Sequence, residues 1–312
     1  MLSVFLTVLG FALIGAALLD VFQTLFHPAG RGAMSDWTAQ VIWKCFRRAA
    51  TRYRKLLTYA GPTAILAIIT TWAALTWFGF ALIYFPRLHS SFAFTPGVEG
   101  TRFAGLLEAL DLSLGGLITL SEGINASSPW LQLLRGAEAV IGFGLLTASV
   151  SWLLSIYPVL ESRRSIAERA ALLHNAELEN HLDITHDAPQ EAQDWIFNIG
   201  CDLASLRNQM AQFPITYYFH VGEAQTSLAG ALPYLAELAD RASSSSGVSA
   251  LLAAGTVLGG AVHNFLNTLA EVFLAMPGED DRAVLRAYAR EEMTDLMLRD
   301  RTIPFPRHAD AS

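Results

Sequence analysis

The sequence predicts an all-α membrane protein with three transmembrane helices, one re-entrant half-helix and a helical domain outside the membrane. The 312 residues are 53% hydrophobic and 16% charged, whereas soluble domains are about a quarter charged. The charge is also unevenly divided, because residues 1–160 contain 10 Lys/Arg and 7 Asp/Glu whereas residues 161–312 contain 11 and 21. An apolar half is therefore followed by an acidic half that is compatible with water.

Three uncharged, apolar runs are long enough to cross a bilayer, namely Leu2–Leu19, Thr63–Phe85 and Ala139–Leu160. At a rise of 1.5 Å per residue, about 20 residues span a hydrocarbon core of about 30 Å. The first run has no positively charged start and is followed at once by Asp20. We therefore interpret it as an uncleaved helix, with a cleaved signal peptide as the alternative.

The basic residues predict the orientation of these helices. They gather between the first two runs and again just after the third, as Arg163, Arg164 and Arg169, while residues 86–104 contain only Arg87 and Arg102. Loops rich in Lys and Arg stay in the cytoplasm. We expect a multi-pass protein of the cell (inner) membrane, with the N-terminus outside, residues 86–130 outside and the C-terminal half cytoplasmic. The basic connector should form an amphipathic helix, lying at the lipid headgroups or in solvent.

The segment Arg102–Leu120 differs from the three runs. It is apolar but interrupted by Glu108, Asp111, Gly115 and Gly116. A fourth crossing there would also place the C-terminal half outside, against the basic cluster that follows the third run. We therefore expect a half-helix that enters the membrane and returns on the same side. Irregular backbone at that depth must be buried in protein or line water, so a water-lined path is implied.

Residues 108–123 read EALDLSLGGLITLSEG. This stretch resembles the pore helix and selectivity filter of the two-transmembrane potassium-channel family, whose pattern is roughly DALYFSFVTLTTVGYG. The matching positions are Ala109, Leu110, Ser113, Leu117, Thr119 and Gly123. The resemblance covers about residues 60–165 and implies a homotetramer in the bilayer. It places Asp111 and Ser113 on the pore helix and assigns the filter to Thr119, Leu120, Ser121, Glu122 and Gly123.

The filter departs from the family's TVGYGD most consequentially where Ser121 replaces a glycine, Glu122 the tyrosine and Ile124 the aspartate. A narrow carbonyl cage selective for potassium is therefore not expected. Four copies of Glu122 around one axis would recruit cations and bind divalent ions that block the path. This position resembles the filter glutamate of cyclic-nucleotide-gated channels. The alternative is a Glu122 turned away from the axis and paired with Arg102 or Arg135.

Other residues of the third run have two interpretations each. Gly142 and Gly144 are a gating hinge or positions of close helix packing. Thr147 and Ser151 lie along one helix face, which suits a wet pore lining or ordinary hydrogen bonds between helices. On the half-helix, we favour an ion pair of Glu108 and Asp111 with Arg102 or Arg135.

The chain divides into residues 1–58 (first helix and connector), 59–160 (pore domain) and 161–312 (cytosolic helical domain). We expect helices over residues 162–180, 187–212, 217–242, 250–276 and 280–300. The fourth is apolar enough to suggest a span, but its polar residues favour a bundle helix; they are His263, Asn264, Asn267 and Glu271. One more cluster contains His181, Asp183, His186 and Asp187. We interpret it as an exposed segment between helices, with a site for a divalent metal as the alternative.

No catalytic motif or phosphate-binding loop is present, so neither an enzyme nor a cofactor is expected. The acidic C-terminal half has no basic patch, which argues against a nucleic-acid partner. The leading hypothesis is a homotetrameric ion channel that passes monovalent cations with weak or altered selectivity through residues Thr119–Gly123. The alternative is a non-conducting, channel-derived membrane scaffold or sensor that acts on a protein partner through its cytosolic helical domain.

Overall fold

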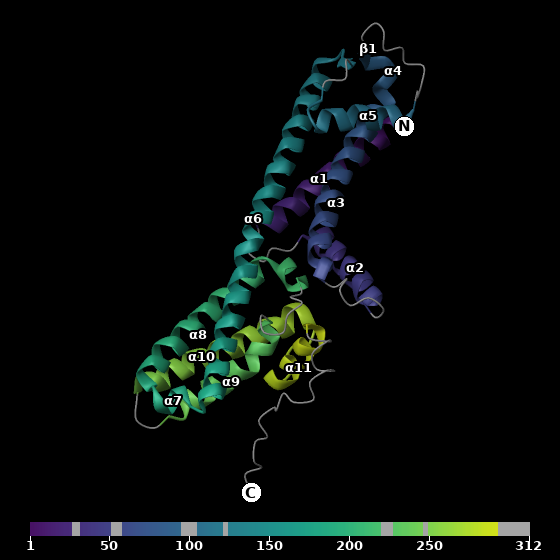
Figure 1. The fold of residues 1–312 in the computed structure, drawn as a ribbon. Coiled ribbons are helices and arrows are strands. Elements are labelled where there is room, and N and C mark those ends of the chain that lie inside the picture. The colour runs from purple at the N-terminus through teal and green to yellow at the C-terminus, as the bar shows by residue number, and fades with distance from the viewer. Residues whose placement is uncertain are drawn as a thin grey trace. The chain divides into compact units, whose positions relative to one another are not determined.

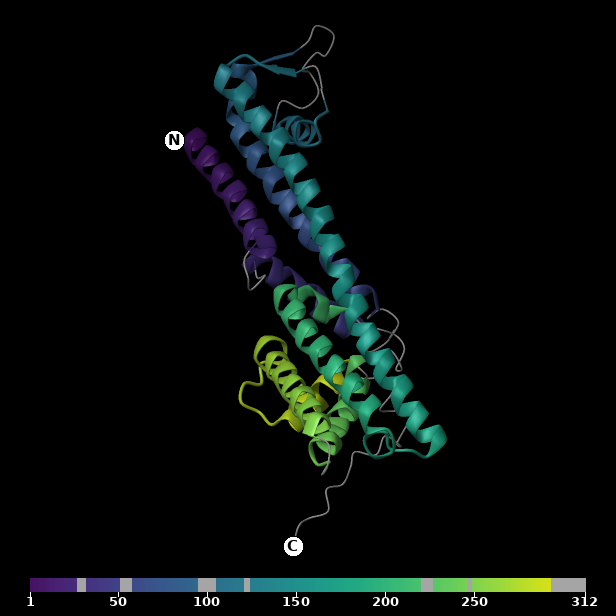
Figure 2. The ribbon, with the colours of Figure 1, turned by 90° about the vertical axis from the view of Figure 1, so that its left-hand side faces the viewer.

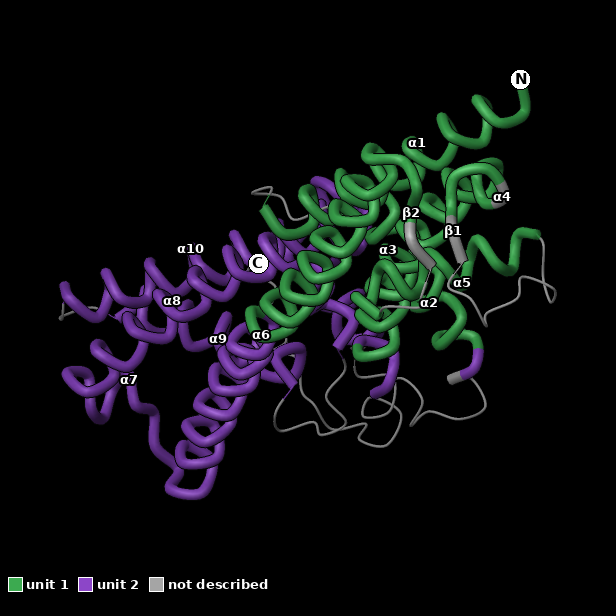
Figure 3. Tube along the Cα trace, turned by 90° about the horizontal axis from the view of Figure 1, so that it is seen from above, with its two compact units in different colours: residues 1–48, 62–155 green, residues 49–61, 156–312 purple. Residues whose placement is uncertain are grey.

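The computed structural model describes residues 1–26, 32–50, 58–94, 105–120, 124–219, 227–245 and 249–292. Three of the predicted filter residues, Ser121, Glu122 and Gly123, lie outside these ranges, as does Arg102. The chain forms two compact units. Unit 1 comprises Met1–Arg48 and Pro62–Ser155, and unit 2 comprises Ala49–Gly61 and Ile156–Ser312 (Figure 3). Unit 1 thus combines the first helix with most of the predicted pore domain.

Among the described residues, four helices are long and apolar enough to cross a membrane: α1 (Leu2–Phe26), α3 (Ala60–Tyr84), α6 (Pro129–Asn180) and α10 (Ser249–Leu269) with the turn that follows it. The first three contain the three predicted runs, so their helical prediction is confirmed (Figure 1). The prediction that the third run continues as a helix to residue 180 is also confirmed, because α6 is unbroken over 52 residues.

In unit 1, α1 packs against α3 through glycines. A Cβ atom on Gly10 would overlap the carbonyl oxygen of Gly79, and Ile14 fills the space beside Gly79. The two backbones can approach this closely only because no side chain separates them. Without a hydrophobic driving force between helices in lipid, such small-residue contacts are a common basis of helix association.

The end of α1 is joined to α2 (Ala33–Ala50) and to α3 by Asp20. This carboxylate is 3% exposed. It accepts hydrogen bonds from the backbone N–H of Met34 at 2.8 Å, from that of Ser35 at 3.1 Å and from Trp72 Nε1 at 2.8 Å, as well as from the Ser35 hydroxyl. Because the first N–H groups of a helix have no partner within it, Asp20 caps α2 and fixes where α2 starts.

Beyond α3 the chain forms a short 3-10 turn η2 (Phe85–Arg87), α4 (Leu88–Ser91) and the strand β1 (Phe92–Phe94). Strand β2 (Ile124–Ala126) pairs with β1 in antiparallel register, with Phe92 opposite Ala126. The sequence did not predict these strands, because three residues are too few to show a period of two. Their pairing brings together the two ends of the intervening segment, which contains α5 (Leu106–Leu117).

Unit 2 contains the second part of α6 and the elements α7 (Ile184–Asp187), α8 (Pro189–Gln212), the 3-10 turn η3 (Pro214–Tyr218), α9 (Leu228–Ser243), α10, the π-helical turn η5 (Ala270–Leu274) and α11 (Asp281–Glu292). Its core is built on side chains that are fully or almost fully buried, among them Ile196, Leu203, Leu232, Leu258 and Phe265. The predicted helices 187–212 and 250–276 are confirmed with small changes at their ends.

The prediction of one helix over 217–242 is wrong at its beginning, since α9 starts at Leu228 and Tyr217 belongs to η3. Two contacts explain the difference. The Tyr217 ring stacks on Phe273 with centroids 4.5 Å apart, and its hydroxyl donates to Glu291 at 2.5 Å. These contacts with η5 and α11 outweigh local helix propensity, which is a weak preference.

Replacing Asp20 with alanine should destabilise the protein by at least about 2 kcal/mol, because buried donors of α2 and Trp72 lose their acceptor. Thermal unfolding of the purified protein in detergent micelles measures this. The matched control is Asp36→Ala, since Asp36 accepts from the Gln40 amide at an exposed position. Equal midpoints for the two variants would contradict the capping role of Asp20.

Candidate pore-loop site

Helix α5 lies across the end of α3 that is followed by η2, and reaches towards α6 (Figures 1 and 2). Two hydrogen-bonding groups tie it to α3. Trp77 Nε1 donates to the carbonyl oxygen of Leu110 at 2.7 Å, and the Ser113 hydroxyl lies 3.0 Å from the carbonyl oxygen of Trp77. Ala109 and Leu112 are fully buried on the same side. The buried face of α5 is therefore directed into unit 1, while Asp111 is exposed.

The carboxylate of Glu138, on α6, joins all three helices. It is fully buried. Its Oε1 lies 2.6 Å from the hydroxyl of Ser113 on α5, and its Oε2 accepts from the hydroxyl of Tyr84 on α3 at 2.8 Å. A Cβ atom on Gly116 would overlap Oε2, so glycine at that position makes room for the carboxylate. A buried carboxylate is tolerated only when it is hydrogen-bonded in this way.

The last turn of α5 rests directly on α6 at Gly142. A Cβ atom there would overlap the carbonyl oxygen of Leu117, whereas one on Gly144 would meet no atom within 4 Å. The two glycines named from the sequence therefore have different surroundings: Gly142 contacts the backbone of α5, and Gly144 is exposed. Of these two glycines, only Gly142 is a position of close packing among the described residues.

Helix α5 ends in a Schellman motif. The N–H of Leu120 donates to the carbonyl oxygen of Gly115 at 2.7 Å, and that of Thr119 to Gly116 at 3.2 Å. This motif needs a left-handed residue, usually glycine. Here it is Thr119, with φ of 60°. A β-branched side chain is strongly disfavoured in that conformation, so the first residue of the predicted filter carries backbone strain.

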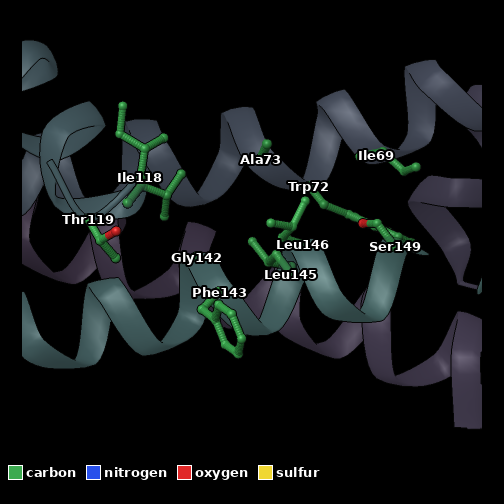
Figure 4. A pocket seen from close by; sticks show the side chains of 11 residues that line it. Ile69, Trp72, Ala73, Ile118, Thr119, Gly142, Phe143, Leu145, Leu146 and Ser149 are labelled. Atoms are coloured by element: carbon green, nitrogen blue, oxygen red, sulfur yellow. The ribbon is translucent and has the colours of Figure 1, made fainter. Parts of the chain in front are cut away.

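A cavity of about 340 Å³ lies between α3, the end of α5 and α6. Ile118 and Thr119 line one end, and Ile69 and Ser149 line the other, with Trp72 between them (Figure 4). Apart from the hydroxyls of Thr119 and Ser149, the lining is apolar. The cavity leaves an unfilled space directly behind the turn that leads to residues 121–123.

The exposed side of α6 within unit 1 carries two parallel stripes at helical spacing. One has small or hydroxyl side chains: Gly144, Thr147, Ser151 and Ser155. The other is apolar: Phe143, Leu146, Val150 and Leu154, with exposed fractions from 49% to 68%. The hydroxyls of Thr147 and Ser155 donate to carbonyl oxygens one turn earlier, at 2.9 Å each.

The structure brings several predicted site residues together and adds others. Ser113 lies on the buried face of α5, while Thr119 and Leu120 come just after the end of this helix. Glu138 and Tyr84 were not among the predicted site residues: from the sequence, Glu138 was expected only at the outer end of the third helix, against Arg135, and a single tyrosine in the second apolar run gives no periodic signal. The strain at Thr119 also had no signal, since a C-terminal cap is recognised by glycine or asparagine.

No model of a known protein family matches the sequence, and no solved structure matches it either. The sequence is 26% identical over 225 residues to YdjJ of Bacillus subtilis strain 168, which is described as an uncharacterized membrane protein. The match covers 70% of this chain and 64% of YdjJ, so the chain spans less than two thirds of that relative's length.

The chain is a membrane protein. Both the likeness to YdjJ and the apolar helices support this conclusion. The protein therefore sits in a lipid bilayer. The membrane explains why the polar groups of unit 1 are hydrogen-bonded to each other. Buried carboxylates such as Glu138 and Asp20 are costly in a membrane and must have partners.

Gly142→Ala and Gly144→Ala form a matched pair. The first adds a methyl group against the Leu117 carbonyl and should destabilise the protein by about 1–3 kcal/mol. The second adds it to open space and should be neutral or stabilising by up to about 1 kcal/mol, because alanine favours a helix. Thermal unfolding in detergent compares them. Equal destabilisation by both would show that α5 does not rest on Gly142.

Proposed function

We propose that the protein is a homotetrameric ion channel that passes monovalent cations, with α5 as its pore helix and residues Thr119–Gly123 as its filter. The observation that carries the proposal is the pairing of β1 with β2. It joins the chain before α5 to the chain after it, at the end of unit 1 where α3 stops and α6 starts. The segment with α5 therefore leaves and returns at the same end.

The length of α5 supports this interpretation. Its 12 residues rise about 18 Å at 1.5 Å per residue, well short of the roughly 30 Å of a hydrocarbon core. The non-helical residues Thr119 and Leu120 that follow it need partners other than lipid, and water in a passage supplies them. The C-terminal end of a helix also carries a partial negative charge, so the end of α5 favours a cation near Thr119.

The two stripes of α6 fit an assembly around an axis. In this arrangement Gly144, Thr147 and Ser151 face water, while the stripe that contains Phe143 and Val150 faces lipid or a neighbouring copy. The hydroxyls that donate within the helix still offer oxygen lone pairs to passing ions. Gly144, which is exposed and where a Cβ atom would meet none of the described residues within 4 Å, is the better candidate for a hinge than Gly142.

Glu122 sets the selectivity in this proposal. Four carboxylates close to one axis share protons and titrate together, and they attract monovalent and divalent cations alike. Weak selectivity among monovalent ions and block by divalent ions follow. Ser121, in place of a glycine, disfavours the narrow carbonyl cage that selects potassium.

We further propose that α1, α3 and α6 are the three spans, with the N-terminus outside and unit 2 largely cytoplasmic. Helix α10 is apolar enough to span, but its buried side packs in the core of unit 2 through Leu251, Leu258 and Phe265. Its exposed His263 lies between Asp281, at 2.8 Å, and Asn267, at 3.0 Å. Such a polar chain is costly in lipid.

A second candidate is a non-conducting scaffold or sensor that acts through the helical domain. The departures at Ser121 and Glu122 favour it, because they remove the glycine and tyrosine of the family's filter. Unit 2 would then be the working part, with a cytosolic protein as its partner. The two candidates differ in one measurable property, the passage of ions.

Purified protein reconstituted in liposomes should let potassium ions leave the liposomes and so dissipate a potassium gradient, which a fluorescent cation indicator detects. Glu122→Gln should remove block by calcium and change the ratio of sodium to potassium flux, since it removes the charge from the ring. Glu108→Gln, at a half-buried position in the first turn of α5 and far from the filter in sequence, is the control and should leave both unchanged. Absence of flux at every pH, voltage and calcium level would favour the scaffold.

Thiol accessibility tests the stripes of α6. With Cys45 and Cys201 replaced by serine, Thr147→Cys and Ser151→Cys should react with a charged, water-soluble thiol reagent in membranes. Val150→Cys and Leu154→Cys should react at least about tenfold more slowly, because thiolates form in water and not in lipid. Mass shifts of the whole protein give the rates. Equal rates for the four variants would contradict a water-filled passage along Thr147 and Ser151.

A further inference from the structure

Helix α2 carries a basic face whose position is fixed by contacts. Its buried side consists of Ser35, Thr38, Ala39 and Trp43, each at most 9% exposed. On the other side, Lys44, Arg47 and Arg48 are exposed, and the Trp37 indole is 67% exposed. We call Trp37, Lys44, Arg47 and Arg48 the basic face of α2.

Three of these residues lie on one line along the helix. Trp37, Lys44 and Arg48 are spaced seven and four residues apart, which places their side chains within about 40° of each other on an α-helix. Arg47 lies beside them. The basic face is therefore a strip of three exposed cations in the second half of α2, with the Trp37 ring nearer the start of the helix.

The depth of this strip follows from Asp20. The Asp20 carboxylate binds the first turn of α2 and also the Trp72 indole of α3, and the last residue of α1, Phe26, comes only six residues after Asp20. Helix α2 therefore begins beside the last turns of α1, level with the middle of α3, and changes direction relative to α1 (Figures 1 and 2). Its exposed cations come later, with Arg47 and Arg48 in its last turn, where a basic amphipathic helix that leaves the hydrocarbon core meets the lipid headgroups.

We propose that the basic face of α2 binds the phosphate groups of anionic phospholipids at the membrane surface. Lysine and arginine near a charged leaflet are attracted to it, and tryptophan prefers the interface between headgroups and hydrocarbon. Charge complementarity thus identifies an acidic phospholipid rather than a zwitterionic one. The binding requires only that the chain is inserted in a bilayer and does not depend on ion conduction.

The test compares lipids bound to the full chain in detergent by native mass spectrometry, with phosphatidylglycerol or phosphatidylcholine added. In Lys44→Gln/Arg47→Gln/Arg48→Gln, phosphatidylglycerol binding should weaken by about fivefold per lost cation at low salt, on the order of a hundredfold in total. Phosphatidylcholine binding should not change. The difference should shrink as salt is raised.

Two further variants control for charge and folding. Arg207→Gln/Arg282→Gln/Arg286→Gln removes three charges from unit 2 and should bind phosphatidylglycerol as the unaltered protein does. Lys44→Arg/Arg47→Lys/Arg48→Lys keeps the charge of α2 and should also retain the lipid.

Three results would overturn the proposal. One is equal phosphatidylglycerol binding by the two charge-removing variants. Another is displacement of the lipid by excess inorganic phosphate, which would identify a site for the free anion. The last is a loss of stability in the α2 variant without any difference in bound lipid, which would show that these cations stabilise the fold and do not bind lipid.

Discussion

The architecture of unit 1 depends on one buried carboxylate, that of Glu138. Its two oxygens bind a hydroxyl from α3 and a hydroxyl from α5, while its backbone belongs to α6. Breaking such an arrangement by removing one partner is costly, because the remaining groups stay buried without hydrogen bonds. The position of α5 is therefore fixed relative to both long helices. The contact at Gly142, the strained turn at Thr119 and the cavity behind that turn all follow from this placement.

A second carboxylate performs the same task elsewhere in unit 1. Asp20 collects hydrogen bonds from α2 and α3, and glycine at position 32 gives it room. In both places a small residue beside an acidic group lets the backbone approach it. Polar groups inside a membrane protein are expensive unless paired, and this protein uses its pairs to set the positions of its shorter helices.

Much of the fold could be predicted from the sequence, because long apolar runs bounded by charges leave few alternatives. A short helix in place of α5 could also be predicted, since Glu108 and Asp111 interrupt an apolar segment too short to span. The roles of Glu138, Tyr84 and Thr119 could not be predicted, because each depends on contacts between distant segments. The same applies to the β1–β2 ladder and to η3, where the stacking of Tyr217 on Phe273 replaced an expected helix with a tight turn. The departures from the potassium-channel filter pattern at Ser121, Glu122 and Ile124 were plain in the sequence, but their effect in the proposed channel depends on how the proposed copies surround an axis.

An experimental density map of the protein in a lipid nanodisc, viewed along the membrane normal, would show whether α5 belongs to a pore. We expect four copies around one axis, with α5 of each copy pointing its C-terminal end at that axis and residues 119–123 closest to it. Copies that do not meet at an axis, or a segment 105–123 that lies flat on the surface or crosses the bilayer completely, would contradict this expectation.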